Sequence, residues 1–300
     1  MIVRSTKVAL FRRFVAELEG AAPRDAPDLS AYDDAAREAA RFAWATRIVD
    51  EYRSVAVFAE LLRLLTDLEA SYPAQCAVHR LIGDELRHTE LTTRVVEWLG
   101  GLDGLAIDLA DVGLPPRDAS ESALVRALHI IGREIVVTEE ESIYALAAYR
   151  NATTEPSIRA VLDEILVDEV RHAAVGRALM AELVGRLDDA EQARLEGVMR
   201  EDRAHLREVY LASARGGAGR TLGGSIERAD LEAIWRKLRR GGVPVELAEP
   251  AVSGMRGVAR GGGAGRSAGP RRSRAAARYD RRRDDGAALD AVLRRRHVRD

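Results

Sequence analysis

A nearly identical five-residue pattern occurs twice in the chain, as "DELRH" at 84–88 and "DEVRH" at 168–172. In each copy a glutamate precedes a histidine by three residues, so that on a helix both side chains project from the same face. A single Glu-x-x-His is expected roughly 0.4 times by chance in a chain of this length, and one copy would carry little information. Two copies, both inside the longer pattern Asp-Glu-x-Arg-His, indicate a shared chemical role.

An additional acid interrupts an apolar stripe one helix upstream of each copy. Glu51 lies 34 residues before Glu85, and Glu139 lies 30 residues before Glu169. Over these distances a chain can follow one helix, turn and return to the same height. A carboxylate in a buried stripe is costly unless it is paired or bound to a metal ion. The pattern therefore predicts four carboxylates and two imidazoles at one level: Glu51, Glu85, His88, Glu139, Glu169 and His172.

Two positions in this set have competitors. The run "EEE" at 139–141 offers three acids, of which the helical register favours Glu139, with Glu140 as the next choice. Glu60 competes with Glu51 but lies about a quarter-turn off its stripe. Carboxylates together with imidazoles and no thiolate suit iron or manganese. Two such ions would offset the repulsion among four acids; the alternative is a metal-free core of Arg–Asp and His–Glu pairs.

Helical periodicity predicts the elements that hold these residues, and the expected fold class is all-α. Two short connections imply antiparallel pairs of helices, whereas the long connection after Gly100 can place the third helix parallel to the second. Asp118 and Ser120 are candidates for the N-cap of that third helix. The pattern is a four-helix bundle with a long crossover and further C-terminal helices, predicted at about 34–68, 74–99, 120–150, 156–186 and 190–213.

The doubled motif resembles that of the ferritin-like diiron-carboxylate superfamily, and its wording is similar to bacterial multicomponent monooxygenases and related diiron oxygenases. The resemblance covers about residues 36–186. It implies two iron ions, with manganese possible, between Glu51, Glu85 and His88 on one side and Glu139, Glu169 and His172 on the other. It also implies that the aspartate of each motif accepts a hydrogen bond from the free N–H of a ligand histidine across the repeat, and pairs with the motif arginines. These supporting residues are Asp84, Arg87, Asp168 and Arg171.

The function expected from this site is that of a non-haem diiron oxidoreductase. It would activate O2 to hydroxylate, desaturate or N-oxygenate a small organic substrate, and would need an electron donor. Thr89, one turn after Glu85, is a candidate hydrogen-bond donor to bound oxygen. The alternatives are a ferroxidase or iron-handling protein, and a non-catalytic ferritin-like bundle that binds a partner. A homodimer is compatible with each of these.

Cysteine and motif counts exclude several other classes. The single cysteine, Cys76, excludes a disulfide framework, a multi-cysteine zinc site and a rubredoxin module. Cys76-x-x-His79 has no second half-site and indicates ordinary packing. Asp202-x-x-His205 also lacks a partner and is interpreted as a solvated helix face.

The chain divides by composition. We expect an N-terminal helix and linker at 1–33, the metal-binding bundle with a fifth helix at 34–215, and an accessory helical segment at 216–250. Residues 251–300 hold 14 Arg and 5 Asp and form an Arg/Gly-rich tail that we expect to be disordered. Since this tail has only Tyr279 as an aromatic, nucleic-acid binding is not expected. No apolar run is long enough for a signal peptide or a membrane span, so we expect a cytoplasmic protein.

Overall fold

The computed structural model describes residues 22–104, 112 and 121–240. Within these ranges every extended regular element is a helix and no β-strand occurs, which confirms the all-α prediction for this part of the chain. The predicted N-terminal helix, and the tail predicted at 251–300, lie outside the described residues.

The first two helices of the described part form a hairpin. α2 spans Asp34–Asp67 and α3 spans Tyr72–Trp98. Each begins at a side-chain cap, which satisfies a backbone N–H that has no partner within the helix. The Asp33 carboxylate accepts from a first-turn amide at 2.7 Å, and the Ser71 hydroxyl does the same at 3.3 Å.

The third predicted helix is continuous but changes its winding. α4 covers Ala123–His129, a π-helical segment, η2, covers Ile130–Val137, and α5 covers Thr138–Ala152. Ser122 caps the start of α4, so helix formation begins after the N-cap candidates Asp118 and Ser120, which lie outside the described residues. The hydrophobic pattern did not predict the π-helical segment. Such segments contain an extra residue per turn and often occur at functional sites.

The C-terminal half of the described part consists of two long helices, joined by a 3₁₀ turn, and shorter elements. A capping box between Asp188 and Glu191 begins the second of these long helices, which is the predicted fifth helix. The described part of the predicted accessory segment, residues 216–240, contains a short 3₁₀ turn and one helix. These elements are α6 (Pro156–Leu183), η3 (Val184–Arg186), α7 (Asp189–Ser213), η4 (Ala218–Leu222) and α8 (Arg228–Arg240).

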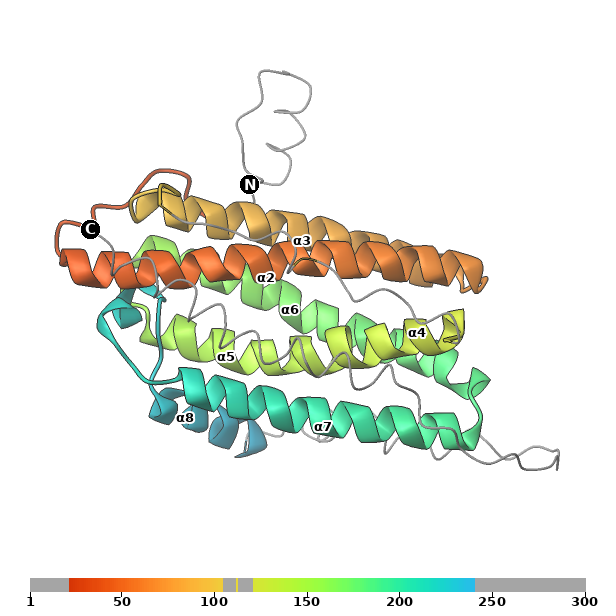
Figure 1. Ribbon diagram of the computed structural model, residues 1–300. Coiled ribbons are helices and arrows are strands. Elements are labelled where there is room, and N and C mark those ends of the chain that lie inside the picture. The colour runs from red at the N-terminus through yellow and green to blue at the C-terminus, as the bar shows by residue number, and fades with distance from the viewer. Residues whose placement is uncertain (1–21, 105–111, 113–120, 241–300) are drawn as a thin grey trace, which may run out of the picture. The chain divides into compact units, whose positions relative to one another are not determined.

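The long helices pack side by side (Figure 1). α2 lies along α3 and α5 lies along α6, while α3 also contacts α6 and α2 contacts α4 and η2. α3 and the rod formed by α4, η2 and α5 run in the same direction, as the long connection predicts. α7 packs on the outer side, against η2 and α5.

Two apolar blocks occupy the space between these helices. One contains Phe58, Leu81 and Ile135, and the other contains Trp44 and Ile165. Along each of the four long helices the chain passes from one block to the other, and the predicted acids and histidines lie at the crossing point. The core is therefore divided by a polar layer at one level.

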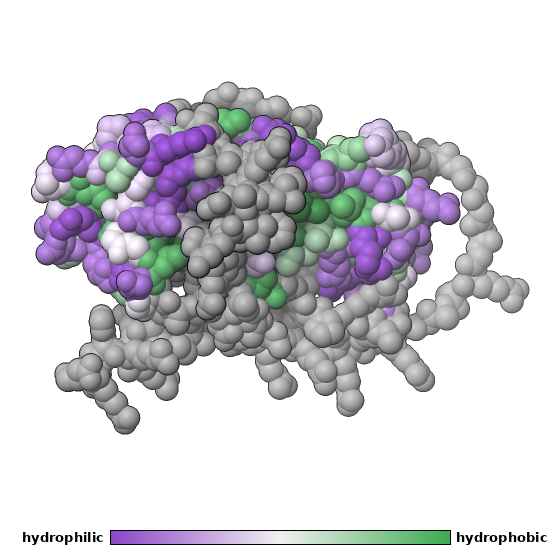
Figure 2. All heavy atoms as spheres, turned by 90° about the horizontal axis from the view of Figure 1, so that it is seen from above, coloured by the Kyte–Doolittle hydropathy of each residue, from purple (hydrophilic) through white to green (hydrophobic). Residues whose placement is uncertain are grey.

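The exposed large apolar residues are few and scattered over three helices. They include Tyr72, Val167, Val170 and Val209. Figure 2 shows hydrophilic and hydrophobic residues interspersed over the coloured part of one face. Single exposed apolar residues are normal on a protein surface and indicate no binding function by themselves. Within the described residues, none of the helices combines the length and the apolar character that crossing a membrane requires.

Candidate metal centre

The structure brings all six sequence-predicted ligand residues together in the polar layer. α2 contributes one glutamate, the α5 end of the third rod contributes another, and α3 and α6 each contribute a glutamate and a histidine. Their candidate ligand atoms form two overlapping groups that share Glu85, and within each group all atoms lie within 4.8 Å of one another. The first group is Glu51, Glu85, His88 and Glu169; the second is Glu85, Glu139 and His172.

The ring of His88 faces three of the carboxylates with its Nδ1 atom. This atom lies 3.4 Å from Glu51 Oε2, 3.4 Å from Glu169 Oε1 and 3.8 Å from Glu85 Oε2. The imidazole is fully buried. The Nδ1 side of the ring is therefore turned into the carboxylate layer.

His172 has the same orientation on the opposite helix. Its Nδ1 atom lies 3.0 Å from Glu85 Oε1, 3.8 Å from Glu169 Oε2 and 4.0 Å from Glu139 Oε1. The two imidazole rings are 5.6 Å apart between centroids. Each histidine thus faces acids from both halves of the repeated motif.

This geometry fits a metal ion at each group. Ligand nitrogen and oxygen atoms lie about 2.0–2.2 Å from a small divalent ion, so atoms that share an ion are roughly 3–4 Å apart. The distances around His88 and His172 fall in that range. Moreover, Glu85 Oε1 and both histidine Nδ1 atoms are buried and have no hydrogen-bond partner among the residues that the structure describes. Buried polar atoms without partners are rare, and metal ligation would satisfy them.

A second layer of charged residues holds the outer edge of each imidazole. His88 Nε2 lies 3.2 Å from Asp168 Oδ2, and His172 Nε2 lies 3.5 Å from Asp84 Oδ2. Each histidine is therefore next to the aspartate of the other motif copy, the cross-repeat arrangement that the resemblance implies. An aspartate that accepts a hydrogen bond from Nε2–H keeps the proton on Nε2 and leaves the Nδ1 lone pair available for a metal ion.

The motif arginines connect the two aspartates. Arg87 donates to Asp84 at 3.0 Å and also contacts Asp168. Arg171 donates to Asp84 at 3.0 Å and lies 2.8 Å from Asp168. The partly buried Arg87 and the exposed Arg171 therefore neutralise two buried carboxylates and join α3 to α6 beside the candidate centre.

Electrostatics indicate that three of the four acids of the metal-free centre hold protons, whereas His88 helps to lower the pKa of Glu51. Burial raises the pKa of Glu85 and of Glu139 to about 8, and it raises the pKa of Glu169 well above its ordinary value. Burial alone would lower the pKa of His172, but the neighbouring Asp84 and Glu85 carboxylates raise it to about 9. Metal ions can replace these protons, since ligands must be deprotonated to bind.

The structure also locates the competing acids. Glu140 accepts from Arg177 at 2.7 Å and from Arg203 at 2.6 Å, which turns it away from the centre and leaves Glu139 in the candidate ligand group. Glu60 pairs with Arg126 at 3.0 Å. Glu140 and Glu60, which the sequence left as alternative ligands, therefore form ion pairs with arginines instead.

Thr89 is buried next to the centre, but its hydroxyl donates to the backbone carbonyl of Glu85 at 2.9 Å. In this arrangement the hydroxyl hydrogen of Thr89 is donated within α3. The suggested role of Thr89 toward oxygen therefore gains no support from the geometry.

Sequence reasoning missed other contributors. The Ser142 hydroxyl lies 3.3 Å from Glu169 Oε2, although its closer acceptor is the backbone carbonyl of Glu139 at 2.8 Å. Its place one turn after Glu139 on the same stripe was the available signal. The interpretation of Asp202 as solvated was wrong: it is buried and pairs with Arg133 of η2 at 3.1 Å. Its neighbour His205 is exposed, and Cys76 and His79 are exposed on α3.

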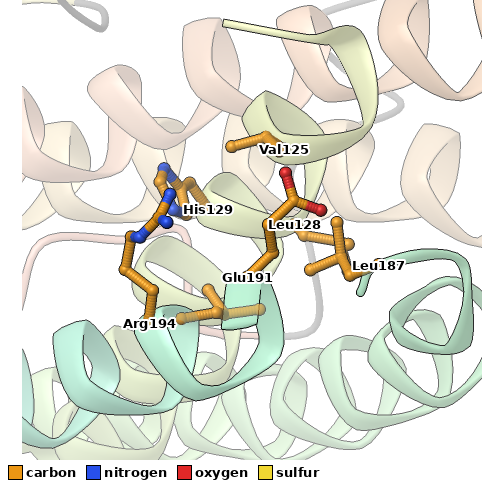
Figure 3. A pocket seen from close by; sticks show the side chains of 7 residues that line it. Val125, Leu128, His129, Leu187, Glu191 and Arg194 are labelled. Carbon is orange, nitrogen blue, oxygen red and sulfur yellow. The ribbon is translucent and has the colours of Figure 1, made fainter. Parts of the chain in front are cut away.

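A small pocket lies elsewhere, between the start of the third rod and α7 (Figure 3). Val125, Leu128 and His129 line it from α4, and Glu191 and Arg194 line it from α7. Its lining includes none of the six candidate ligands, so it does not extend the centre.

Comparisons of the chain with family models, with curated proteins and with solved structures found no match.

Proposed function

We propose that this protein is a ferritin-like, non-haem diiron oxidoreductase that activates O2 to oxidise a small organic substrate. The observation that carries the proposal is the two overlapping ligand groups, which share Glu85 and contain one histidine each. Two adjacent groups of this kind would hold two ions, with Glu85 contributing to both groups. A Glu from each of two helices and a Glu-x-x-His from each of two others is the ligand pattern of diiron bundle proteins.

The helix arrangement supports the same assignment. The pairwise contacts of α2 with α3 and of α5 with α6, together with the parallel course of α3 and the third rod, agree with a four-helix bundle with a long crossover. In such bundles, metal sites are built in the core from side chains on facing helices. The polar layer between the two apolar blocks occupies that place.

Iron is favoured by the donor set. Oxygen and imidazole ligands without thiolate suit iron or manganese more than structural zinc. Reduced iron, when bound, would supply the electrons that convert O2 into an oxidant.

The surrounding residues would prepare and protect this chemistry. Asp168 would hold a proton at Nε2 of His88, and Asp84, 3.5 Å from Nε2 of His172, would do the same once the two groups close to hydrogen-bond distance, which would orient both Nδ1 atoms inward. Both imidazoles are fully buried, and the side chains of the four acids are at most 13% exposed, which limits access of water to the centre. Glu51 is the most exposed of the four acids, so solvent reaches the centre most readily on the α2 side.

Anaerobic iron loading tests the metal centre. We expect the unaltered protein to bind two Fe(II) ions per chain and the double variant E85A/E169A to bind none, since Glu85 belongs to both ligand groups and Glu169 to the group that contains His88. E182A, which removes an exposed acid from the same helix α6, serves as a control and should retain two ions. One tightly bound zinc ion per chain, or no metal, would contradict the diiron centre.

Exposure of the loaded protein to O2 separates an oxidoreductase from an iron-storage protein. We expect oxidation to stop at two irons per chain, with the protein remaining a monomer or dimer in size-exclusion chromatography. A storage ferroxidase would oxidise tens of irons per chain and would elute as a large shell. That second result would replace the proposed activity while leaving the metal centre intact.

A further inference from the structure

Three consecutive glutamates follow the π-helical segment, and only one of them faces the candidate metal centre. Successive residues of a helix point about 100° apart, so a rotation of α5 by about that angle would exchange Glu139 for Glu140. η2 inserts a wider turn directly before Thr138, where α5 begins. The backbone hydrogen bonds that continue from α4 therefore do not fix the rotation of α5 as they would in an uninterrupted α-helix. Contacts from other helices must therefore determine which acid faces inward.

Arginines from α6 and α7 supply these contacts. Arg203 donates to Glu140 at 2.6 Å and to Glu141 at 2.9 Å, so that one guanidinium joins both acids. Arg177 of α6 donates to Glu140 at 2.7 Å, and Arg207 of α7 donates to Glu141 at 3.0 Å. Glu140, Glu141 and Arg203 are all buried. Bonds between buried opposite charges are strong and directional, and they oppose rotation of α5 in either direction.

The other half of the repeated motif has no such arrangement. The alignment of Glu51 with Glu139 places Tyr52 and Arg53 where the second half has Glu140 and Glu141. The side chain of Glu51 is 13% exposed, compared with 7% for Glu139. α7 therefore supports only the half of the centre that contains Glu139. A helix that served only the general stability of the fold would not need this asymmetry.

We propose that Arg203, together with Arg177, is a positioning residue of the metal centre. It fixes the rotation of α5 so that Glu139, and neither Glu140 nor Glu141, reaches the ion held by Glu85 and His172. This inference rests on the proposed two-metal centre. It assigns α7, which contributes no ligand in the described part of the chain, a specific role in metal binding.

The test is an anaerobic titration of the metal-free full-length protein with Fe(II), which resolves the two affinities. In R203M we expect one ion to bind about 10–100-fold more weakly, as is typical when a group that orients a ligand is removed. The second ion should keep its affinity. R126M is the matched control: it breaks the partly buried Arg126–Glu60 pair on the same rod and should leave both affinities unchanged.

A double-mutant cycle identifies the route. If Arg203 acts through Glu139, then E139Q weakens the same ion and the combined variant R203M/E139Q shows little further loss. Additive losses, or R203M binding both ions as the unaltered protein does, would overturn the inference. R203K provides a second variant if R203M fails to fold: it keeps the charge but lacks the planar fork that spans two carboxylates, so an intermediate loss at the same ion is expected. Unchanged affinities in a folded R203K would likewise overturn the inference. If the unaltered protein binds no iron, the proposed centre itself is wrong and the positioning role falls with it.

Discussion

Replacement of Asp168 by asparagine tests the layer of charges behind the ligands. The Asp168 carboxylate accepts three contacts: from His88 Nε2 at 3.2 Å, from Arg171 and from Arg87. Asparagine keeps the shape, but its NH₂ group must face at least one of these donors. It also removes the negative charge that favours a proton on Nε2 and a free lone pair on Nδ1.

The expected magnitude follows from these contacts. Loss of a group that orients a ligand histidine lowers metal affinity about 10–100-fold, which corresponds to about 1.4–2.8 kcal/mol at one ion. The fold should be retained, because Arg87 and Arg171 each keep a hydrogen bond to Asp84 at 3.0 Å. We expect the weakened ion to be the one bound by His88, whereas D84N should weaken the ion bound by His172.

Isothermal titration with Fe(II) in the absence of oxygen measures both affinities, and circular dichroism checks that the helices are intact. D163N is the matched control, because it makes the same change of charge on α6 at a half-exposed acid that pairs with Arg150 at 2.6 Å. D168N with the same two affinities as D163N would refute the orienting role and would leave Asp168 with a structural one.

Two further predictions concern stability. In the folded, metal-free protein the pKa of Glu85 and of Glu139 is raised to about 8, and the pKa of His172 is raised to about 9. In the unfolded chain these groups have their ordinary pKa values, 4.5 for glutamate and 6.5 for histidine, so they lose their protons at lower pH. The melting temperature of the metal-free protein should therefore fall as pH rises from about 5 to 9; a rising melting temperature in thermal scans would contradict these protonation states. Two glycine variants should have opposite effects in urea unfolding. G224A places a Cβ 2.5 Å from a backbone atom of α2 and should cost about 1–3 kcal/mol. G83A meets open space in the middle of α3 and should stabilise the protein by about 0.5–1 kcal/mol. Equal effects of the two glycine variants would show that packing around η4 is loose.

The positions of the helices followed from local signals in the chain. The apolar residues recur at helical spacing, and the observed bounds of α2 and α7 agree with the predicted ones within one or two residues. These features depend on neighbours in the sequence, such as the Asp33 cap and the capping box of α7, so they could be predicted before the tertiary structure was known. The six candidate ligands could also be identified, because an acid in an apolar stripe conflicts with its surroundings unless another group compensates its charge.

Tertiary contacts determined the side-chain partners that the local sequence pattern left open. Glu139 and Glu140 are adjacent on one helix and differ only by its rotation, which the π-helical segment and the arginines of α6 and α7 determine together. Asp202 was wrongly interpreted as solvated because its partner, Arg133, comes from an element 69 residues away in sequence. Likewise, the pairing of each histidine with the aspartate of the other motif copy was implied by a resemblance and not by spacing. A carboxylate near a helix surface is compatible with water, an arginine or a metal ion, and only the packing of distant helices selects among them.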